Sequence, residues 1–134
     1  MKFKAIVVSA LLAPGAVFAA SHPLEHAPIP IEIGLHKEGK TYYFQNSRGK
    51  SFYTYDQDKP GKSNCWEKCI EVWAPLLSRA GAKPLGEDWT LIPREYDRMQ
   101  WVYKGKPVYF NVAENFLGGD ANLTNDGHWH VLKP

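Results

Sequence analysis

Short runs of aromatic and β-branched residues, separated by turn-forming residues, make up most of the chain. Such runs predict strands at residues 41–46, 51–55, 89–92, 99–104, 107–112 and 129–132. Residues 47–50 join the first two runs and predict a hairpin, and Lys-Gly-Lys predicts a tight turn before residue 107. The pattern therefore predicts a small, mainly β domain.

One short helix is expected around the two cysteines. Asn64 can cap a helix that runs from Asn64 or Cys65 to about Trp73, with Glu67 three residues after the cap. Pro75 then ends it. On a helix, a spacing of four residues places two cysteine Cα atoms about 6 Å apart, within reach of a disulfide. The helix is therefore expected to carry a Cys65–Cys69 bond.

The start of the chain predicts the compartment. Lys2 and Lys4 precede an apolar run at residues 5–17, and small residues follow it. This order is typical of a secretory signal peptide, and the apolar run is too short for a membrane span. We expect cleavage after Ala19, and no lipid anchor because no cysteine lies at the junction. Residues 1–19 would thus be the signal peptide of a periplasmic or secreted protein.

A proline-rich segment follows the expected cleavage site. Residues 20–32 contain three prolines and are expected to form an extended, mobile leader. The remaining residues, 33–134, have the length of a single domain with a modest core.

Charge and cysteine content narrow the classes of function. The chain has 16 Lys and Arg against 14 Asp and Glu, and loss of Lys2 and Lys4 leaves 14 of each. This balance argues against nucleic-acid binding, which needs excess positive charge. In an oxidising compartment, the two cysteines predict a structural disulfide.

The two halves of the domain share an ungapped repeat at an offset of 56 residues. The identical pairs are Gly49 and Gly105, Lys50 and Lys106, Tyr53 and Tyr109, Trp73 and Trp129, and Leu76 and Leu132. Asp58 also matches Glu114 in charge. We expect two related β-units, at about residues 40–77 and 96–134, whose half-cores face each other.

Several spaced motifs resemble one known family. Tyr53, Tyr55 and Asp58 form a Tyr-x-Tyr-x-x-Asp pattern, which Pro60-Gly61, Cys65-x-x-x-Cys69 and Val-Trp-Ala-Pro-Leu-Leu follow. The second half carries Arg94, Gln100, Trp101, Gly105, Pro107 and Tyr109 in the same order as the family. Over roughly residues 33–134 the chain resembles the bacterial secreted proteins and lipoproteins with the Yx(FWY)xxD motif, secreted repeats of unknown function. The resemblance implies no catalytic residue and no cofactor.

The tyrosine motif has two interpretations. Tyr53 and Tyr55 share one face of the expected strand, so we expect them to pack in the core. Asp58 would lie past the strand end and accept hydrogen bonds from turn amides at residues 61–62. The alternative is a stacking platform for a sugar or another flat ligand, with Asp58 as its polar contact. Trp101 and Tyr109 are further candidates for such a platform.

The histidines suggest a metal site as an alternative. Cleavage after Ala19 would leave Ala20-Ser21-His22, whose amine, two backbone nitrogens and imidazole suit Cu(II) in a square plane. His128 and His130 share a strand face, but two ligands are too few for a closed zinc site. We therefore expect no bound cofactor, with copper or another transition metal as the alternative.

The leading interpretation is a non-catalytic binding or accessory module. No set of nucleophile, base and orienting residue stands out in the sequence. Its partner would be a small ligand or a cell-envelope protein, without nucleic acid or a membrane span. The first alternative is metal binding through His22, with or without His128 and His130. The second is thiol–disulfide exchange by Cys65, since a cysteine at a helix N-terminus is a better nucleophile.

Overall fold

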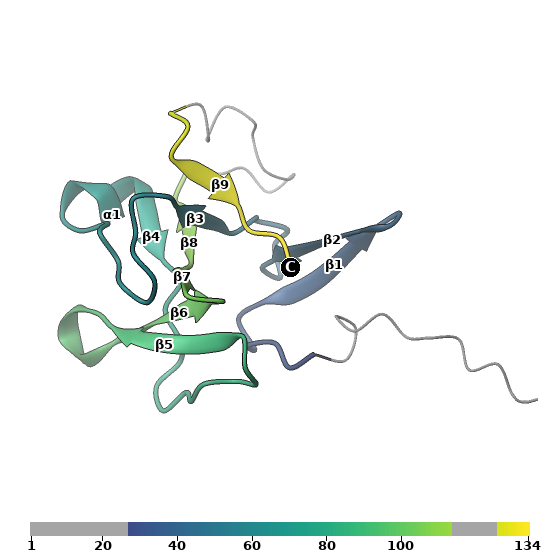
Figure 1. Cartoon of the computed structure of the whole chain (residues 1–134), viewed down its shortest axis with the longest axis horizontal. Helices are drawn as coiled ribbons and strands as arrows, with labels where there is room; N and C mark the ends of the chain where they lie inside the picture. Colours follow the sequence, from purple (N-terminus) through teal and green to yellow (C-terminus); the bar gives the residue numbers. More distant parts are fainter. Residues whose placement is uncertain (1–26, 114–125) are drawn as a thin grey trace, which may run out of the picture.

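A computed structural model describes residues 27–113 and 126–134 of the 134-residue chain. Within these residues the chain forms three antiparallel sheets and one short α-helix, so the expectation of a small, mainly β domain is confirmed (Figure 1). The central sheet has the strand order β4-β8-β3-β9. Its strands are β3 (Tyr53–Tyr55), β4 (Trp73–Pro75), β8 (Tyr109–Asn111) and β9 (Trp129–Val131).

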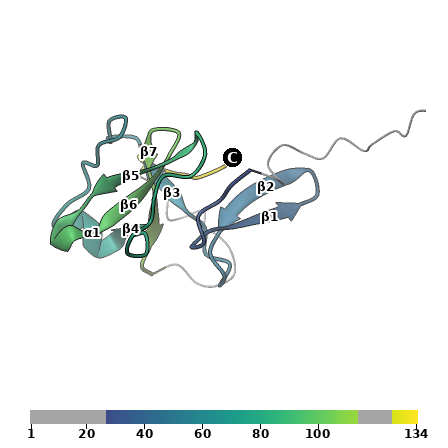
Figure 2. The ribbon, with the colours of Figure 1, turned by 90° about the horizontal axis from the view of Figure 1, so that it is seen from below.

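Two hairpins accompany the central sheet. The first is β1 (Gly34–Glu38) with β2 (Thr41–Gln45), and the second is β5 (Trp89–Pro93) with β6 (Met99–Tyr103), extended by β7 (Lys106–Pro107). A 3₁₀ turn, η2 (Glu95–Asp97), closes the second hairpin. Figure 2 shows the two hairpins at opposite ends of the domain. Their inner residues still meet, because the rings of Phe44 and Trp89 lie 5.3 Å apart.

The hairpin expected between residues 41–46 and 51–55 is wrong. β2 pairs with β1, a strand that the pattern did not reveal, and only a single bridge joins Gln45 to Ser51. The reason lies in the central sheet, where β3 pairs with both β8 and β9 and has no free side left. Residues 47–50 therefore form a connection between sheets, which the Asn46 side chain holds by accepting from two backbone amides at 2.9 Å each. The tight turn expected at Lys-Gly-Lys is present between β6 and β7.

The central sheet carries the repeat in its register. Tyr53 pairs with its own counterpart, Tyr109, at the centre. Thr54 pairs with His130 on one side, and the equivalent positions, Phe110 and Ala74, pair on the other. Each unit therefore gives its last strand to the other unit: β9 pairs with β3, and β4 pairs with β8. The units are related by a two-fold arrangement, and each begins with a hairpin strand, β1 or β5, that lies before the expected ranges of 40–77 and 96–134.

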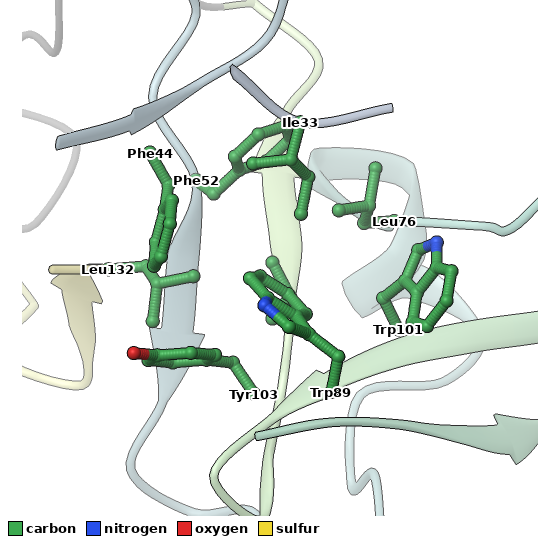
Figure 3. Packing of buried hydrophobic residues seen from close by; sticks show 9 residues of the cluster. Ile33, Phe44, Phe52, Leu76, Trp89, Trp101, Tyr103 and Leu132 are labelled. Atoms are coloured by element: carbon green, nitrogen blue, oxygen red, sulfur yellow. The ribbon is translucent and has the colours of Figure 1, made fainter. Parts of the chain in front are cut away.

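The central sheet separates two hydrophobic clusters. Alternation along its strands sends Phe52 to one face and Tyr53 to the other. The larger cluster, drawn in Figure 3, lies against the hairpins and consists of Ile33, Phe44, Phe52, Leu76, Trp89, Trp101, Tyr103, Val108 and Leu132. The smaller cluster consists of Tyr53, Cys65, Trp73, Tyr109 and Trp129. Repeat partners thus share a cluster, Leu76 with Leu132 and Trp73 with Trp129.

The end of the expected leader is part of the fold. Pro30 and Ile33 are buried. The Glu32 carboxylate accepts hydrogen bonds from the Trp101 indole at 3.1 Å and from the Arg79 amide at 2.8 Å. A mobile leader that runs as far as residue 32 is therefore wrong, because these apolar side chains leave water together with β1. The signal peptide at 1–19 and most of the leader lie outside the described residues.

The helix is shorter than expected. α1 covers only Lys68–Val72, so neither Asn64 nor Cys65 belongs to it. Asn64 does not cap the helix, because its amide donates to Asp58 Oδ1 and its side chain donates to the Gln57 carbonyl. The carbonyl of Cys65 accepts from Arg94. The chain before Lys68 is thus held by long-range contacts.

Candidate functional site

The aromatic residues of the motif build a symmetric core. Tyr53 lies edge-on to Trp73, with ring centroids 5.0 Å apart, and Tyr109 lies edge-on to Trp129 at 5.1 Å. The two tryptophans stack on each other at 4.1 Å with an interplanar angle of 8°. Each unit thus supplies one tyrosine and one tryptophan to a four-ring arrangement. Offset and edge-to-face ring pairs of this kind stabilise a core beyond their buried area.

Most of the expected ligand platform is inaccessible. Tyr53 and Tyr109 are 0% exposed and Trp101 is 2% exposed. A ligand cannot reach these rings without opening the core. The first interpretation of the motif expected both Tyr53 and Tyr55 in the core, and of these two only Tyr53 is fully buried. Tyr55 and Asp58 are partly exposed, and both line a cavity.

Tyr55 breaks the symmetry of the aromatic arrangement. Its ring stacks on Trp129 at 4.4 Å, so it extends the tryptophan pair to a stack of three rings. The equivalent position in the second unit is Asn111, a buried residue that pairs with Trp73 across β4 and β8. Only the first unit therefore carries the stack out to the surface.

The cavity at the end of this stack has a volume of about 380 Å³. The first unit contributes Thr54, Tyr55, Asp56, Asp58, Lys59 and Pro60, and the second contributes Lys104, Gly105, Lys106, Pro107 and His130. Two turns form its floor, and they are joined because the Gly61 amide donates to the Gly105 carbonyl at 2.8 Å. Gly105 has φ +80°, a conformation that other residues adopt only with strain. The cavity thus exists only where the two units meet.

Asp58 is held by donors that the sequence did not identify. Its Oδ1 accepts from the Asn64 amide at 2.6 Å, and its Oδ2 accepts from the Tyr109 hydroxyl at 2.7 Å. The expected bonds from amides at residues 61–62 are replaced by these two. Burial raises the pKa of Asp58 above its ordinary value, although both hydrogen bonds act against the shift. Burial likewise raises the pKa of Tyr109.

Arg94 extends this network under the disulfide loop. Its guanidinium donates to Ser63 Oγ at 2.7 Å and to the Cys65 carbonyl at 2.9 Å, and it lies 3.6 Å from the centre of the Trp66 ring. Ser63 Oγ is also 2.6 Å from the Tyr109 hydroxyl. Burial lowers the pKa of Arg94. This arginine connects the second unit to the loop of the first. The only sequence signal for this role was the expected resemblance of the second half to a known family.

The two C-terminal histidines meet at one carboxylate. His128 Nδ1 lies 2.9 Å from Asp56 Oδ1, and His130 Nε2 lies 3.2 Å from Asp56 Oδ2. Gln57 Nε2 also donates to Oδ1 at 2.9 Å. The hydrogen bond from Gln57, together with those to the two histidines, lowers the pKa of Asp56. Both histidine side chains are more than half exposed, and the Asp56 side chain is 37% exposed. Asp56 and His130 line the cavity, whereas His128 does not.

This cluster does not have the form of a metal site. Its ring nitrogens bond to different oxygens of one carboxylate. In the described parts of the chain, no three or more His, Cys, Asp or Glu side chains are arranged to hold a metal ion. His22 lies outside those parts, so copper binding at Ala20-Ser21-His22 stays a prediction.

The cysteines form the expected disulfide. The Cα atoms of Cys65 and Cys69 are 5.3 Å apart. Cys65 is fully buried, and it lies before α1 instead of at a helix N-terminus. The reason given for a reactive Cys65 is therefore wrong, because no helix end activates its sulfur and no solvent reaches it.

Comparison with known protein families gives a match over part of the chain. Residues 37–77 match the model of a family described as a secreted repeat of unknown function. The match runs from β1 to just past β4, which is nearly all of the first unit. No curated protein and no solved structure matches the chain. In residues 27–113 and 126–134, no helix is long and apolar enough to cross a membrane.

Proposed function

We propose that the protein is a non-catalytic accessory module of the periplasm or the extracellular space, and that it binds a small ligand in the cavity beside Tyr55. The observation that carries this proposal is the cavity itself. It lies at the junction of the two units, where the exposed edge of the aromatic stack and the two lysine-bearing turns come together. Elsewhere the aromatic residues of the motif are core residues.

The size and the lining of the cavity suit a small molecule. Sites for such ligands measure about 300–1,000 Å³ and combine apolar walls with a few polar groups. Here Tyr55 and Pro60 supply apolar surface, and Asp58 and His130 supply polar atoms. A rigid frame supports this lining, because Asp58 is bonded to Tyr109 in the other unit.

A fragment screen by NMR tests the proposal. With ¹⁵N-labelled mature protein, we expect bound fragments to shift the amides of Thr54, Gly61 and Gly105. Tyr55→Leu keeps an apolar side chain but removes the ring, so it should weaken the same fragments about tenfold. Tyr96→Leu is the matched control, because Tyr96 is 91% exposed and is not part of the cavity lining. Fragments that bind only at other sites, or equally to both variants, would refute the proposal.

Transition-metal binding is a second candidate function. It is motivated by the Ala20-Ser21-His22 sequence, which would form the mature terminus if cleavage occurs after Ala19. Copper titration of the mature protein should show a site that His22→Ala removes. His128→Ala with His130→Ala should leave that site intact, since these side chains already bond to Asp56. An unchanged affinity in His22→Ala would exclude the N-terminal site.

A further inference from the structure

We propose that the cavity beside Tyr55 selects ligands in which a carboxylate or phosphate group is attached to a ring. This inference rests on the proposed function and specifies the ligand class of the same site. It follows from which charged groups around the cavity are already paired and which are not.

The acidic side chains of the cavity are occupied. Both oxygens of Asp58 accept hydrogen bonds, one from Asn64 and one from Tyr109. Both oxygens of Asp56 are bonded as well, to His128 and to His130. These oxygens already have protein donors, so a ligand that brings an ammonium group would have to share them with those partners. The carboxylates of this cavity therefore attract a cation less than carboxylates without partners would.

The basic side chains remain available. Lys59, Lys104 and Lys106 line the same cavity. Neither Lys59 nor Lys106 makes an ion pair with any residue that the structure describes. The Lys104 ammonium lies 5.1 Å from the centre of the Tyr103 ring. The Tyr103 side chain and the Asp88 carboxylate raise the pKa of Lys104, so this side chain stays charged. Three cations at one concave surface produce a positive potential that attracts anions.

Backbone hydrogen bonds fix the positions from which the three lysine side chains extend. Lys59 and Lys62 bond to each other through both backbone amides, at 3.1 and 2.9 Å, and so close the first turn. The Gly61–Gly105 hydrogen bond holds that turn against the one between Lys104 and Lys106. The three side chains therefore start from a fixed frame, and an anion that they bind pays less ordering entropy.

The apolar walls specify the rest of the ligand. Tyr55 and Pro60 present flat or ring-shaped surfaces beside the cations. Sugar and aromatic rings pack on such surfaces, whereas a free inorganic anion leaves them wet. An anionic group on a ring uses both parts of the lining. Uronic acids and sugar phosphates share this chemistry.

Four matched sugars test the inference. Glucose, glucuronate, glucose 6-phosphate and glucosamine are titrated into ¹⁵N-labelled mature protein at pH 7 and low salt, and the Gly61 and Gly105 amides report binding. We expect at least one of the two anionic sugars to bind about tenfold more tightly than glucose, and glucosamine to bind more weakly than glucose. Added salt should weaken the anionic sugars and leave glucose unaffected. The preferred anion distinguishes a carboxylate site from a phosphate site.

Lysine variants locate the effect. Lys59→Gln and Lys106→Gln should each weaken the preferred anion several-fold without changing glucose. Lys106→Arg should restore most of the loss, because it keeps the charge. Lys68→Gln is the control, since Lys68 is exposed on α1 and does not line the cavity. An equal loss in Lys68→Gln would mean that net charge, and not this site, attracts the anion, and it would overturn the inference.

The possible failures are separable. If glucose or glucosamine binds at these amides with the same affinity as the anionic sugars, the inference is overturned, but the proposed binding function remains. Neutral fragments that bind in the cavity, with no anion among the ligands, would have the same meaning. If neither the sugars nor any fragment shifts these amides, the proposed function fails together with the inference.

Discussion

The two β-units provide the central comparison in this molecule. They share strand order, register and the edge-to-face tyrosine–tryptophan pair, so positions that build the sheet are nearly the same in both. They differ where the chain leaves the sheet. The first unit has Tyr55 where the second has Asn111, and it has Cys65 and Cys69 where the second has Ala121 and Asn125.

The differences gather in one part of the fold. Tyr55 is the last residue of β3, and Asp58 and the disulfide loop follow it. Arg94 and Tyr109 of the second unit form hydrogen bonds with this region. What is common to the units makes the core, and what is particular to each makes the cavity and the loop around it. The positions at which the two units differ are therefore the best candidates for functional residues.

The tryptophan stack is the strongest test of equivalence. Trp73→Ala and Trp129→Ala should each reduce the free energy of unfolding by about 3–5 kcal/mol, because each removes a buried indole from the same stack. Urea unfolding followed by circular dichroism measures both. The double variant should lose less than the sum, since the two rings contact each other.

Trp66→Ala is the control for this pair, because its ring is 39% exposed and its loss should cost about 1 kcal/mol. If the alanine variants do not fold, the leucine variants permit the same comparison. The losses of unfolding free energy in the Trp73 and Trp129 variants should be similar. If they differ from each other by as much as the whole loss in Trp66→Ala, the two units do not contribute equally to stability.

The disulfide should give the next largest effect, and only in the first unit. Cys65→Ala with Cys69→Ala should lower the free energy of unfolding by about 2 kcal/mol, since the bond closes a loop with a sequence separation of four. Chemical denaturation of the variant and the wild type measures the difference.

The folded wild type should also resist glutathione, because Cys65 is fully buried. Rapid reduction of the folded protein would contradict this expectation and revive thiol–disulfide exchange as a function.

Asp58 should give the smallest effect, with a definite dependence on pH. Because its pKa is raised in the folded state, the folded protein binds this proton more tightly than the unfolded chain does. The resulting stability is complete below the ordinary pKa of 3.8 and is lost as the pH rises through the raised value. The wild type should therefore lose stability relative to Asp58→Asn as the pH rises above 3.8 and through the raised pKa, by less than about 1 kcal/mol for a half-buried group.

Urea unfolding at several pH values measures this difference. Glu87→Gln serves as a control, because it removes an exposed carboxylate away from the cavity lining. A difference between wild type and Asp58→Asn that is flat with pH, or that has the opposite sign, would show that burial does not dominate at Asp58.

The positions of most strands could be predicted from the sequence, whereas the pairing of the strands could not. Alternating aromatic residues located β2, β5, β6 and β9 to within two residues at either end. Pairing could not be read in the same way, because the partners of β3 lie more than 50 residues away and are selected by the two-fold packing. β1 was missed because its five residues, Gly-Leu-His-Lys-Glu, are mostly exposed and carry little hydrophobic signal.

The site could be predicted only in part for a similar reason. The Tyr55 and Asp58 positions stood out through the motif. Three other features did not stand out, because each depends on contacts between distant segments. They are the lysines of the cavity, the hydrogen bond from Trp101 to Glu32, and the contacts of Asp56 with two histidines. The short helix was predicted, but its start was placed too early. Asn64 has a local capping signal, yet its hydrogen bonds go to Asp58 and Gln57 instead.

The exchange of last strands between the units has a consequence for the ancestry and the assembly of such chains. A chain with only one unit would hold a copy of β3 and a copy of β4 that cannot pair with each other in this sheet. It would complete the same sheet only by joining a second copy as a two-fold homodimer. Fusing two copies in tandem makes closure independent of protein concentration and frees each half to change alone. In a chain built in this way, divergence at one end of the two-fold axis is enough to create a single asymmetric cavity.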